Sequence, residues 1–130
     1  MISWKDDYSV HVKAIDGQHK KFFALINKLA TIKSGERAAI GTVLDELIDY
    51  ATYHFSAEER LMQQHGYPRF EEHCGYHREF MNKALLLKND FGRGKDIEPS
   101  EVMEWAGAWL HQHILRRDLE YAPYVTAKKK

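Results

Sequence analysis

The sequence predicts an all-α protein, an up-down-up-down four-helix bundle preceded by an extended N-terminal arm. Apolar residues recur in four segments with the alternating three- and four-residue spacing of a helix that faces a core. Short stretches that contain glycine or proline separate these segments, which favours antiparallel neighbours in a bundle. The 130 residues contain no internal repeat and no low-complexity run, so we treat residues 1–130 as one domain.

The arm is expected to cover residues 1–16. Its apolar residues, among them Trp4 and Tyr8, fit no helical stripe, so we expect them to pack on the outside of the bundle. Asp16 is a residue type that often caps the start of a helix, and it precedes the first helix, predicted over residues 17–33. The apolar stripe of this helix is Phe22, Phe23, Ile26, Leu29 and Ala30. One turn earlier, the same face carries His19.

The second helix is predicted over residues 37–64, because Ser34 and Gly35 end the first helix and Gly66 and Pro68 end the second. Its stripe runs through Ile40, Leu44, Leu47, Ala51, His54, Glu58 and Leu61. A histidine and a glutamate at core-facing positions need buried partners.

The third helix is predicted over residues 69–91, and Gly92 and Gly94 form the loop after it. Its stripe runs through Phe70, His73, His77, Phe80, Ala84, Leu87 and Phe91. Again two polar residues occupy core positions four residues apart. Residues at this spacing lie on one face of a helix, so both histidines can point at the same object.

The fourth helix is predicted over residues 99–121, with Pro99 in its first turn and Pro123 ending the element. Its stripe begins as Val102, Ala106, Trp109 and His113. The pattern then slips by one residue and resumes at Asp118, which indicates a π-type bulge or a break in the helix. His113 continues the stripe and is assigned to the interior, whereas His111 is assigned to the outside.

The polar residues in these stripes all fall toward one end of an up-down bundle. They are His19, His54, Glu58, His73, His77, His113 and Asp118. Two buried carboxylates among five imidazoles are costly unless cations lie between them. Seven ligands exceed the four that one tetrahedral zinc accepts, so two metal ions are predicted. Imidazole suits iron, copper, zinc or nickel. If both carboxylates bridge the ions, five histidines divide three and two, which leaves an open position that a small molecule can take. With iron as the metal, that molecule is dioxygen.

The donor set differs from that of the ferritin-like di-iron oxidases, which use Glu-x-x-His pairs and a carboxylate-rich shell. Asp16 and His19 form the only acidic match to that spacing in this sequence. A histidine-rich shell lacks carboxylates that can shift to donate or accept protons. It therefore fits reversible binding better than oxidative chemistry.

Composition argues against several other function classes. Lys and Arg together number 19, as do Asp and Glu, which removes the usual electrostatic reason to expect nucleic acid or an anionic membrane as a partner. The lysines at 128–130 are expected to be a solvated tail. No apolar run approaches the roughly 20 residues of a membrane span, and the N-terminus lacks a signal-peptide pattern. The single cysteine, Cys74, has no partner for an internal disulfide and is expected to be a half-buried thiol. We expect a cytoplasmic monomer.

At these positions the chain resembles the hemerythrins, specifically the single-domain bacteriohemerythrins. The resemblance rests on Trp4, Asp16-Gly17-Gln18-His19, His54-Phe55-Ser56-Ala57-Glu58-Glu59, His73-x-x-x-His77, and Trp109 followed by His113-x-x-x-x-Asp118. These motifs cover essentially the whole chain. At His11 the chain departs from the family, where small residues are usual.

The resemblance implies a non-haem pair of iron ions. His73, His77 and His113 would ligate one ion and His19 and His54 the other, with Glu58, Asp118 and an oxo or hydroxo group as bridges. Trp109 and Leu115 match residues that line the dioxygen pocket in the family. The implied function is reversible dioxygen binding, for storage or for delivery to oxygen-requiring enzymes, and not catalysis. The alternatives are a di-iron peroxide or nitric oxide reductase and a sensor of oxygen or iron.

Overall fold

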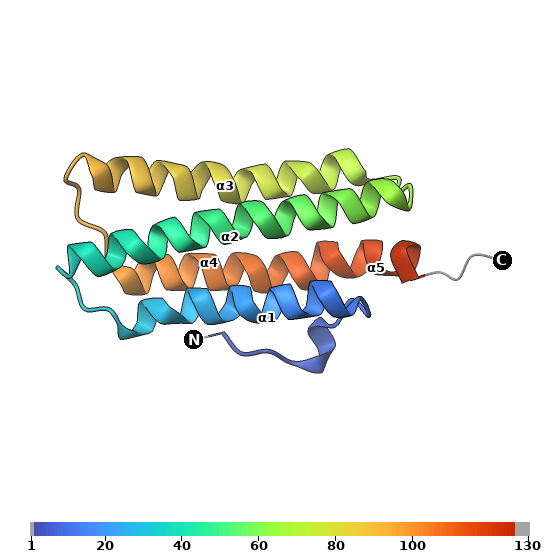
Figure 1. Cartoon of the computed structure of the whole chain (residues 1–130), viewed down its shortest axis with the longest axis horizontal. Helices are drawn as coiled ribbons and strands as arrows, with labels where there is room; N and C mark the ends of the chain where they lie inside the picture. The colour runs from blue at the N-terminus through green and yellow to red at the C-terminus, as the bar shows by residue number, and fades with distance from the viewer. Residues whose placement is uncertain (1, 127–130) are drawn as a thin grey trace.

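A computed structural model of the chain describes residues 2–126. Its four long helices are α1 (Lys13–Asn27), α2 (Arg37–Gln64), α3 (Phe70–Gly92) and α4 (Pro99–His113). They run alternately up and down beside one another, which confirms the predicted all-α four-helix bundle (Figure 1). The lysine tail at residues 128–130, expected to be solvated, lies outside the described residues.

The N-terminal arm lies along the outside of the bundle, next to α1 (Figure 1). It contains one short 3-10 turn, Asp6–Tyr8. Its first part is fixed by Asn27, whose side chain accepts a hydrogen bond from the Ile2 N–H (3.1 Å) and donates one to the Ile2 carbonyl (2.6 Å). Trp4 and Tyr8 pack on Phe23 of α1, with ring centroids 6.1 Å and 5.5 Å away.

The start of α1 corrects the prediction. The helix begins at Lys13 rather than at residue 17, and Val12 occupies the cap position without a side-chain cap. Asp16 therefore lies in the first turn, where a negative charge suits the helix dipole. Its carboxylate accepts hydrogen bonds from the Ser9 hydroxyl (2.6 Å) and the Val10 N–H (2.9 Å). Asp16 ties the arm to the bundle instead of capping the helix, because the arm offers it donors. At its other end α1 stops at Asn27 and continues as a 3-10 turn, Lys28–Thr31.

The turn between α2 and α3 brings these two helices alongside each other. Gly66 has a φ of +63°, a conformation that glycine adopts without steric cost. The N–H of Tyr67 donates to the carbonyl of Met62 (3.0 Å), which satisfies one of the free carbonyls at the end of α2. Residues near the end of α2 and the start of α3 therefore face the same level of the bundle.

The fourth helix contains the slip that the apolar pattern predicts. After α4, residues Ile114–Asp118 (η3) form a π-helical turn, and α5 (Leu119–Thr126) follows. Pro123 does not end the element as predicted, because the helix runs on to Thr126. A proline removes the hydrogen bond to the residue four positions earlier, and its ring crowds the carbonyl of that residue. Here that residue is Leu119, at the junction where the wide turn already interrupts the regular bonding.

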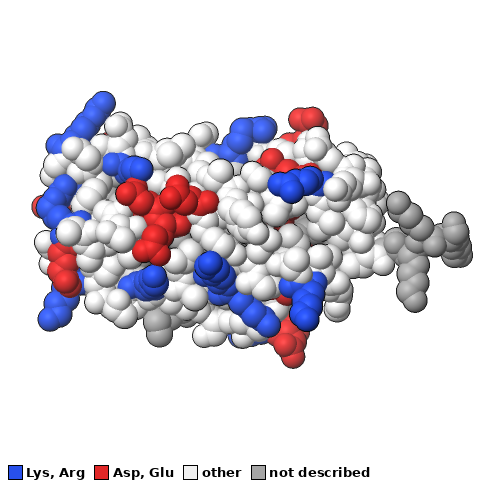
Figure 2. Space-filling view, in the orientation of Figure 1, with Lys and Arg blue, Asp and Glu red and all other residues white. Residues whose placement is uncertain are grey.

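The apolar core has layers along the bundle axis. The largest cluster fills the middle and includes Phe22, Phe55, Phe80 and Leu110. A smaller cluster near the α2–α3 turn includes Met62, Tyr67 and Tyr121. On the surface, charges of both signs are interspersed over the visible face (Figure 2), in keeping with the balanced composition. Within residues 2–126, no helix combines the length and apolarity that crossing a bilayer requires.

Candidate metal centre

The structure brings the seven predicted residues together inside the bundle. Each is 5% exposed or less. They come from every long helix and from the π-helical turn: His19 (α1), His54 and Glu58 (α2), His73 and His77 (α3), His113 (α4) and Asp118 (η3). The four-residue spacings on α2 and α3 place two side chains of each helix on its inner face.

The π-helical turn is what directs Asp118 inward. In a regular α-helix, a residue five positions after His113 would be rotated from it by about 140° and would leave the core-facing side. The extra residue in the wide turn delays that rotation. Both side chains therefore reach the same site, with His113 Nε2 3.1 Å from Asp118 Oδ1.

One group of donors forms what we term the three-histidine position, made by His73, His77 and His113 with Glu58 and Asp118. These five residues each offer a ligand atom within 4.8 Å of the others. Asp118 Oδ1 is 3.1 Å from Nε2 of both His73 and His113. His77 Nε2 lies 3.2 Å from His113 Nε2 and 3.4 Å from Glu58 Oε1.

A second group forms the two-histidine position, made by His19 and His54 with Glu58. His54 Nε2 is 3.1 Å from Glu58 Oε1, and His19 Nε2 is 3.7 Å from Glu58 Oε2. The second oxygen of Asp118, Oδ2, is 3.1 Å from His19 Nε2. Each carboxylate therefore faces histidines of both positions.

Several atoms that face this site lack a hydrogen-bond partner among the described residues. They are Nε2 of His19, His54 and His73, Oε1 of Glu58 and both carboxylate oxygens of Asp118. Buried polar atoms are rarely left without a partner in proteins. These atoms are of the types that ligate metal ions and they converge on one volume, so the donor set fits a pair of bound cations.

The charges of the metal-free site point the same way. Burial lowers the pKa of His19, but Asp118 and Glu58 raise it more, to about 10. Burial also opposes the charge on His77, yet its carboxylate neighbours Glu58 and Glu59 raise its pKa to about 9. Although burial opposes ionisation of Asp118 and Glu58, the histidines around them hold both pKa values below the ordinary range. The two carboxylates thus stay charged, and protons on histidines supply the positive charge that metal ions would bring.

Aromatic side chains enclose the histidines. Phe55 stacks on the ring of His77 (4.0 Å between centroids, 10° between planes). Trp109 stacks on the ring of His113 (4.4 Å, 13°). A hollow of about 260 Å³ between α3 and α4, lined by Tyr76, Glu79, Trp109, Gln112, His113, Arg116 and Arg117, reaches the edge of His113 from the surface. The hollow therefore connects the surface with the edge of one histidine of the three-histidine position.

Three residues around the site were not singled out as site residues by the sequence pattern. Tyr121 is fully buried, and its hydroxyl donates a hydrogen bond to Glu58 Oε2 (2.5 Å). Gln18 Oε1 lies 2.8 Å from His54 Nδ1, and Glu59 Oε2 lies 2.8 Å from His77 Nδ1. A signal did exist for Tyr121, because it follows Asp118 by three residues and so shares its helix face. For Gln18 and Glu59 the sequence offers only adjacency to a candidate ligand.

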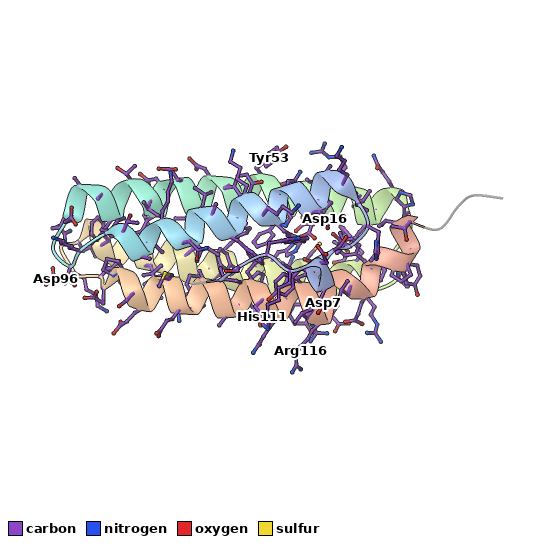
Figure 3. The ribbon with its side chains drawn as sticks, turned by 90° about the horizontal axis from the view of Figure 1, so that it is seen from below. Asp7, Asp16, Tyr53, Asp96, His111 and Arg116 are labelled. Atoms are coloured by element: carbon purple, nitrogen blue, oxygen red, sulfur yellow. The ribbon has the colours of Figure 1, made fainter. Side chains whose placement is uncertain are left out.

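The other residues considered from the sequence take varied positions. Leu115 follows His113 by two residues on the π-helical turn and remains 37% exposed. His111 points away from the site, as predicted, but it is not a free surface residue because its Nδ1 lies 2.8 Å from the Tyr8 hydroxyl of the arm. Figure 3 shows His111 and Arg116 projecting from the outer side of the fourth helix, and Asp16 beside the arm. Cys74 is more buried than predicted, at 7% exposed.

Comparison with known proteins identifies the family. A family model described as the hemerythrin HHE cation binding domain matches residues 10–125. A bacteriohemerythrin of Stenotrophomonas maltophilia is 34% identical over 128 residues, covering 98% of this chain and 83% of that protein. One from Methylococcus capsulatus is 34% identical over 129 residues, 98% of each chain. A crystal structure of wild-type hemerythrin matches with a TM-score of 0.92 at 33% identity, covering 98% of this chain and 99% of that one. The chain belongs to the hemerythrin family.

Proposed function

We propose that this protein binds dioxygen reversibly at a pair of non-haem iron ions, for oxygen storage or for delivery to oxygen-requiring enzymes. The observation that carries the proposal is the unequal division of buried donors between two adjacent positions. Five residues meet at the three-histidine position, and three meet at the two-histidine position, with Glu58 common to both. An ion at the two-histidine position has fewer protein ligands, so it keeps room for an external one.

The ligand roles proposed from the sequence are compatible with this geometry. His73, His77 and His113 would hold one ion, and His19 and His54 the other. Glu58 and Asp118 would bridge them, because the oxygens of each carboxylate face histidines of both positions. An oxo or hydroxo group is proposed as the third bridge. The iron pair would supply two electrons when dioxygen binds and recover them when it leaves.

The protein's own task would be to make that exchange reversible. The rings of Phe55 and Trp109 lie against the ligand histidines and keep water and protons away from the site. We propose that Trp109 and Leu115 line the dioxygen pocket. Trp109 also lines the hollow that reaches His113. Leu115, partly exposed on the π-helical turn, would act as an apolar cover of the pocket.

A binding role, and not an enzymatic one, is proposed because the carboxylates of the site already serve as bridges. Both carry pKa values held low by the surrounding histidines, so neither is suited to donate a proton. We further propose that residues 1–130 act as a single-domain cytoplasmic monomer. The large apolar side chains exposed in the described part of the chain are few: Tyr53, Leu85, Leu86, Leu115 and Tyr124.

The proposal is tested by loading the metal-free protein with ferrous iron under argon and recording its absorption spectrum through cycles of air and argon. We expect two iron ions per chain and an absorption band that appears under air and vanishes on deaeration. A band that never reverses would refute reversible binding. Sustained consumption of peroxide or nitric oxide with a reductant would instead indicate a reductase.

Two variants connect the outcome to named residues. Asp118→Asn keeps the shape of the side chain but removes a bridging charge, so iron content should fall below two per chain. Asp49→Asn, at an exposed position on α2, is the matched control and should bind iron like the parent. Leu115→Ala should shorten the lifetime of the oxygenated form, whereas Leu85→Ala, exposed on α3, should leave it unchanged.

A further inference from the structure

The two metal positions differ in what lies behind their histidines. A ligand histidine usually donates its second ring N–H to an acceptor, which fixes the ring and strengthens the nitrogen that binds the metal. The kind of acceptor matters, because a carboxylate polarises the ring more than a neutral amide does. At this site, the described residues supply different acceptors to different histidines.

At the three-histidine position, one of the histidines, His77, has a carboxylate as its acceptor. Glu59 Oε2 lies 2.8 Å from His77 Nδ1, while His77 Nε2 faces the site. The backbone helps to keep this pair in place, because Glu59 follows Glu58 on α2 and His77 lies on the adjacent helix α3. Glu59 is 34% exposed at its side chain, so it can hold its charge without a large cost of burial.

At the two-histidine position, the acceptors are weaker. His54 Nδ1 meets the amide oxygen of Gln18 at 2.8 Å. His19 is fully buried, and its Nδ1 has no hydrogen-bond partner among the described residues. One ligand ring is thus held by a neutral group and the other by packing alone.

From this difference we infer that the two metal positions fill in order, the three-histidine position first and the two-histidine position second. Glu59 and Gln18 set the difference in metal affinity between the two positions. The inference rests on the proposed metal-binding function and concerns the same site. The number of donors acts in the same direction, since five residues converge at the first position and three at the second. The chain would then have a stable state with one metal ion, and its capacity for dioxygen would depend on the weaker position.

The residues in question can be exchanged with little change of shape. Glu59→Gln leaves a neutral acceptor behind His77, and Gln18→Glu places a carboxylate behind His54. The double variant carries both changes and exchanges the two kinds of acceptor. Gln63→Glu, at an exposed position on α2, is the control for a new negative charge that touches no ligand histidine. Glu71→Gln, at an exposed position in the first turn of α3, is the control for the loss of a negative charge.

The test is an anaerobic titration of the metal-free protein with Co²⁺, followed by d–d absorption and by NMR of the exchangeable ring N–H protons. Two resolved binding steps are expected, separated by at least about tenfold in affinity. At one equivalent, the paramagnetically shifted N–H signal should be that of His77 and not that of His54. Glu59→Gln should weaken the first step by about 10–100-fold and the second much less. Gln18→Glu should raise the affinity of the second step, and the double variant should reduce the difference in affinity between the two steps.

Other results would overturn the inference. Two ions binding in one step in the parent protein would exclude ordered filling. Equal weakening of both steps by Glu59→Gln, or the same effect from Gln63→Glu as from Gln18→Glu, would remove the role of these acceptors. Because Co²⁺ binding needs no dioxygen, this outcome is separate from that of the oxygenation experiment. Ordered filling without reversible oxygenation would refute only the proposed function.

Discussion

Replacing Tyr121 with phenylalanine should destabilise the metal-free protein through the loss of a single hydrogen bond. The hydroxyl of Tyr121 donates to Glu58 Oε2 at 2.5 Å, and both side chains are fully buried. The next partner of that oxygen is His19 Nε2, at 3.7 Å. Tyr121→Phe keeps the ring and its apolar contacts, so the change isolates the hydroxyl.

The expected magnitude follows from the charge of the acceptor. Hydrogen bonds to charged groups contribute about 1.5–3 kcal/mol to stability. Because Tyr121 and Glu58 are fully buried, solvent neither weakens this hydrogen bond nor replaces it when the hydroxyl is removed. We expect a decrease of about 2 kcal/mol in the free energy of unfolding. For a chain of this length, that corresponds to a fall in Tm of roughly 6–10 °C.

The measurement is urea unfolding of chelator-treated protein, followed by circular dichroism. The midpoint should move to lower urea at an unchanged slope, since the surface exposed on unfolding stays the same. Tyr124→Phe is the control, because Tyr124 is 47% exposed on the same short helix and should unfold like the parent. A loss below about 0.5 kcal/mol in Tyr121→Phe, within the range of ordinary surface substitutions, would refute the reasoning.

Three further predictions concern protons, the thiol and the arm. The pKa values of His19 and His77, about 10 and 9 in the metal-free fold, exceed their ordinary value of 6.5, so the stability they provide is complete below pH 6.5 and is lost as the pH rises to about 10. Urea unfolding against pH should show this decline, and metal binding at pH 7 should release protons that a pH indicator detects in weak buffer. Burial raises the pKa of Cys74 to about 11, so the thiol should resist iodoacetamide in the folded protein and react readily in urea, and equal reaction rates in the two conditions would contradict this. Asp16→Asn should weaken the hydrogen bonds that fix the arm and speed tryptic cleavage at Lys13, with unchanged cleavage counting against that role.

The main features of the bundle could be predicted because they depend on residue spacing. A helix repeats every 3.6 residues, so His73 and His77 had to share a face whatever their neighbours were. The same reasoning located the irregular turn before Asp118, because a one-residue slip in an apolar stripe requires a change in helix geometry. The convergence of the seven polar residues followed from the up-down topology.

Features that depend on contacts between segments could not be predicted in this way. Asp16 has the right chemistry for a helix cap, but it bonds to Ser9 and Val10, and their positions depend on how the arm folds back. Tyr121 and Glu59 act on the site through hydrogen bonds to other helices. Nothing in the local sequence around either residue specifies its partner.

The π-helical turn between α4 and α5 sets the inward direction of two side chains, Asp118 and Tyr121. If residues 114–118 formed a regular α-helix instead, every later residue would be rotated by about 100° about the helix axis. Asp118 and Tyr121 would then leave the interior together, taking away a carboxylate of the candidate site and the hydroxyl that donates to Glu58. One inserted residue would rotate both side chains by the same angle. An insertion in this stretch should therefore be far less tolerated than substitutions at its exposed positions.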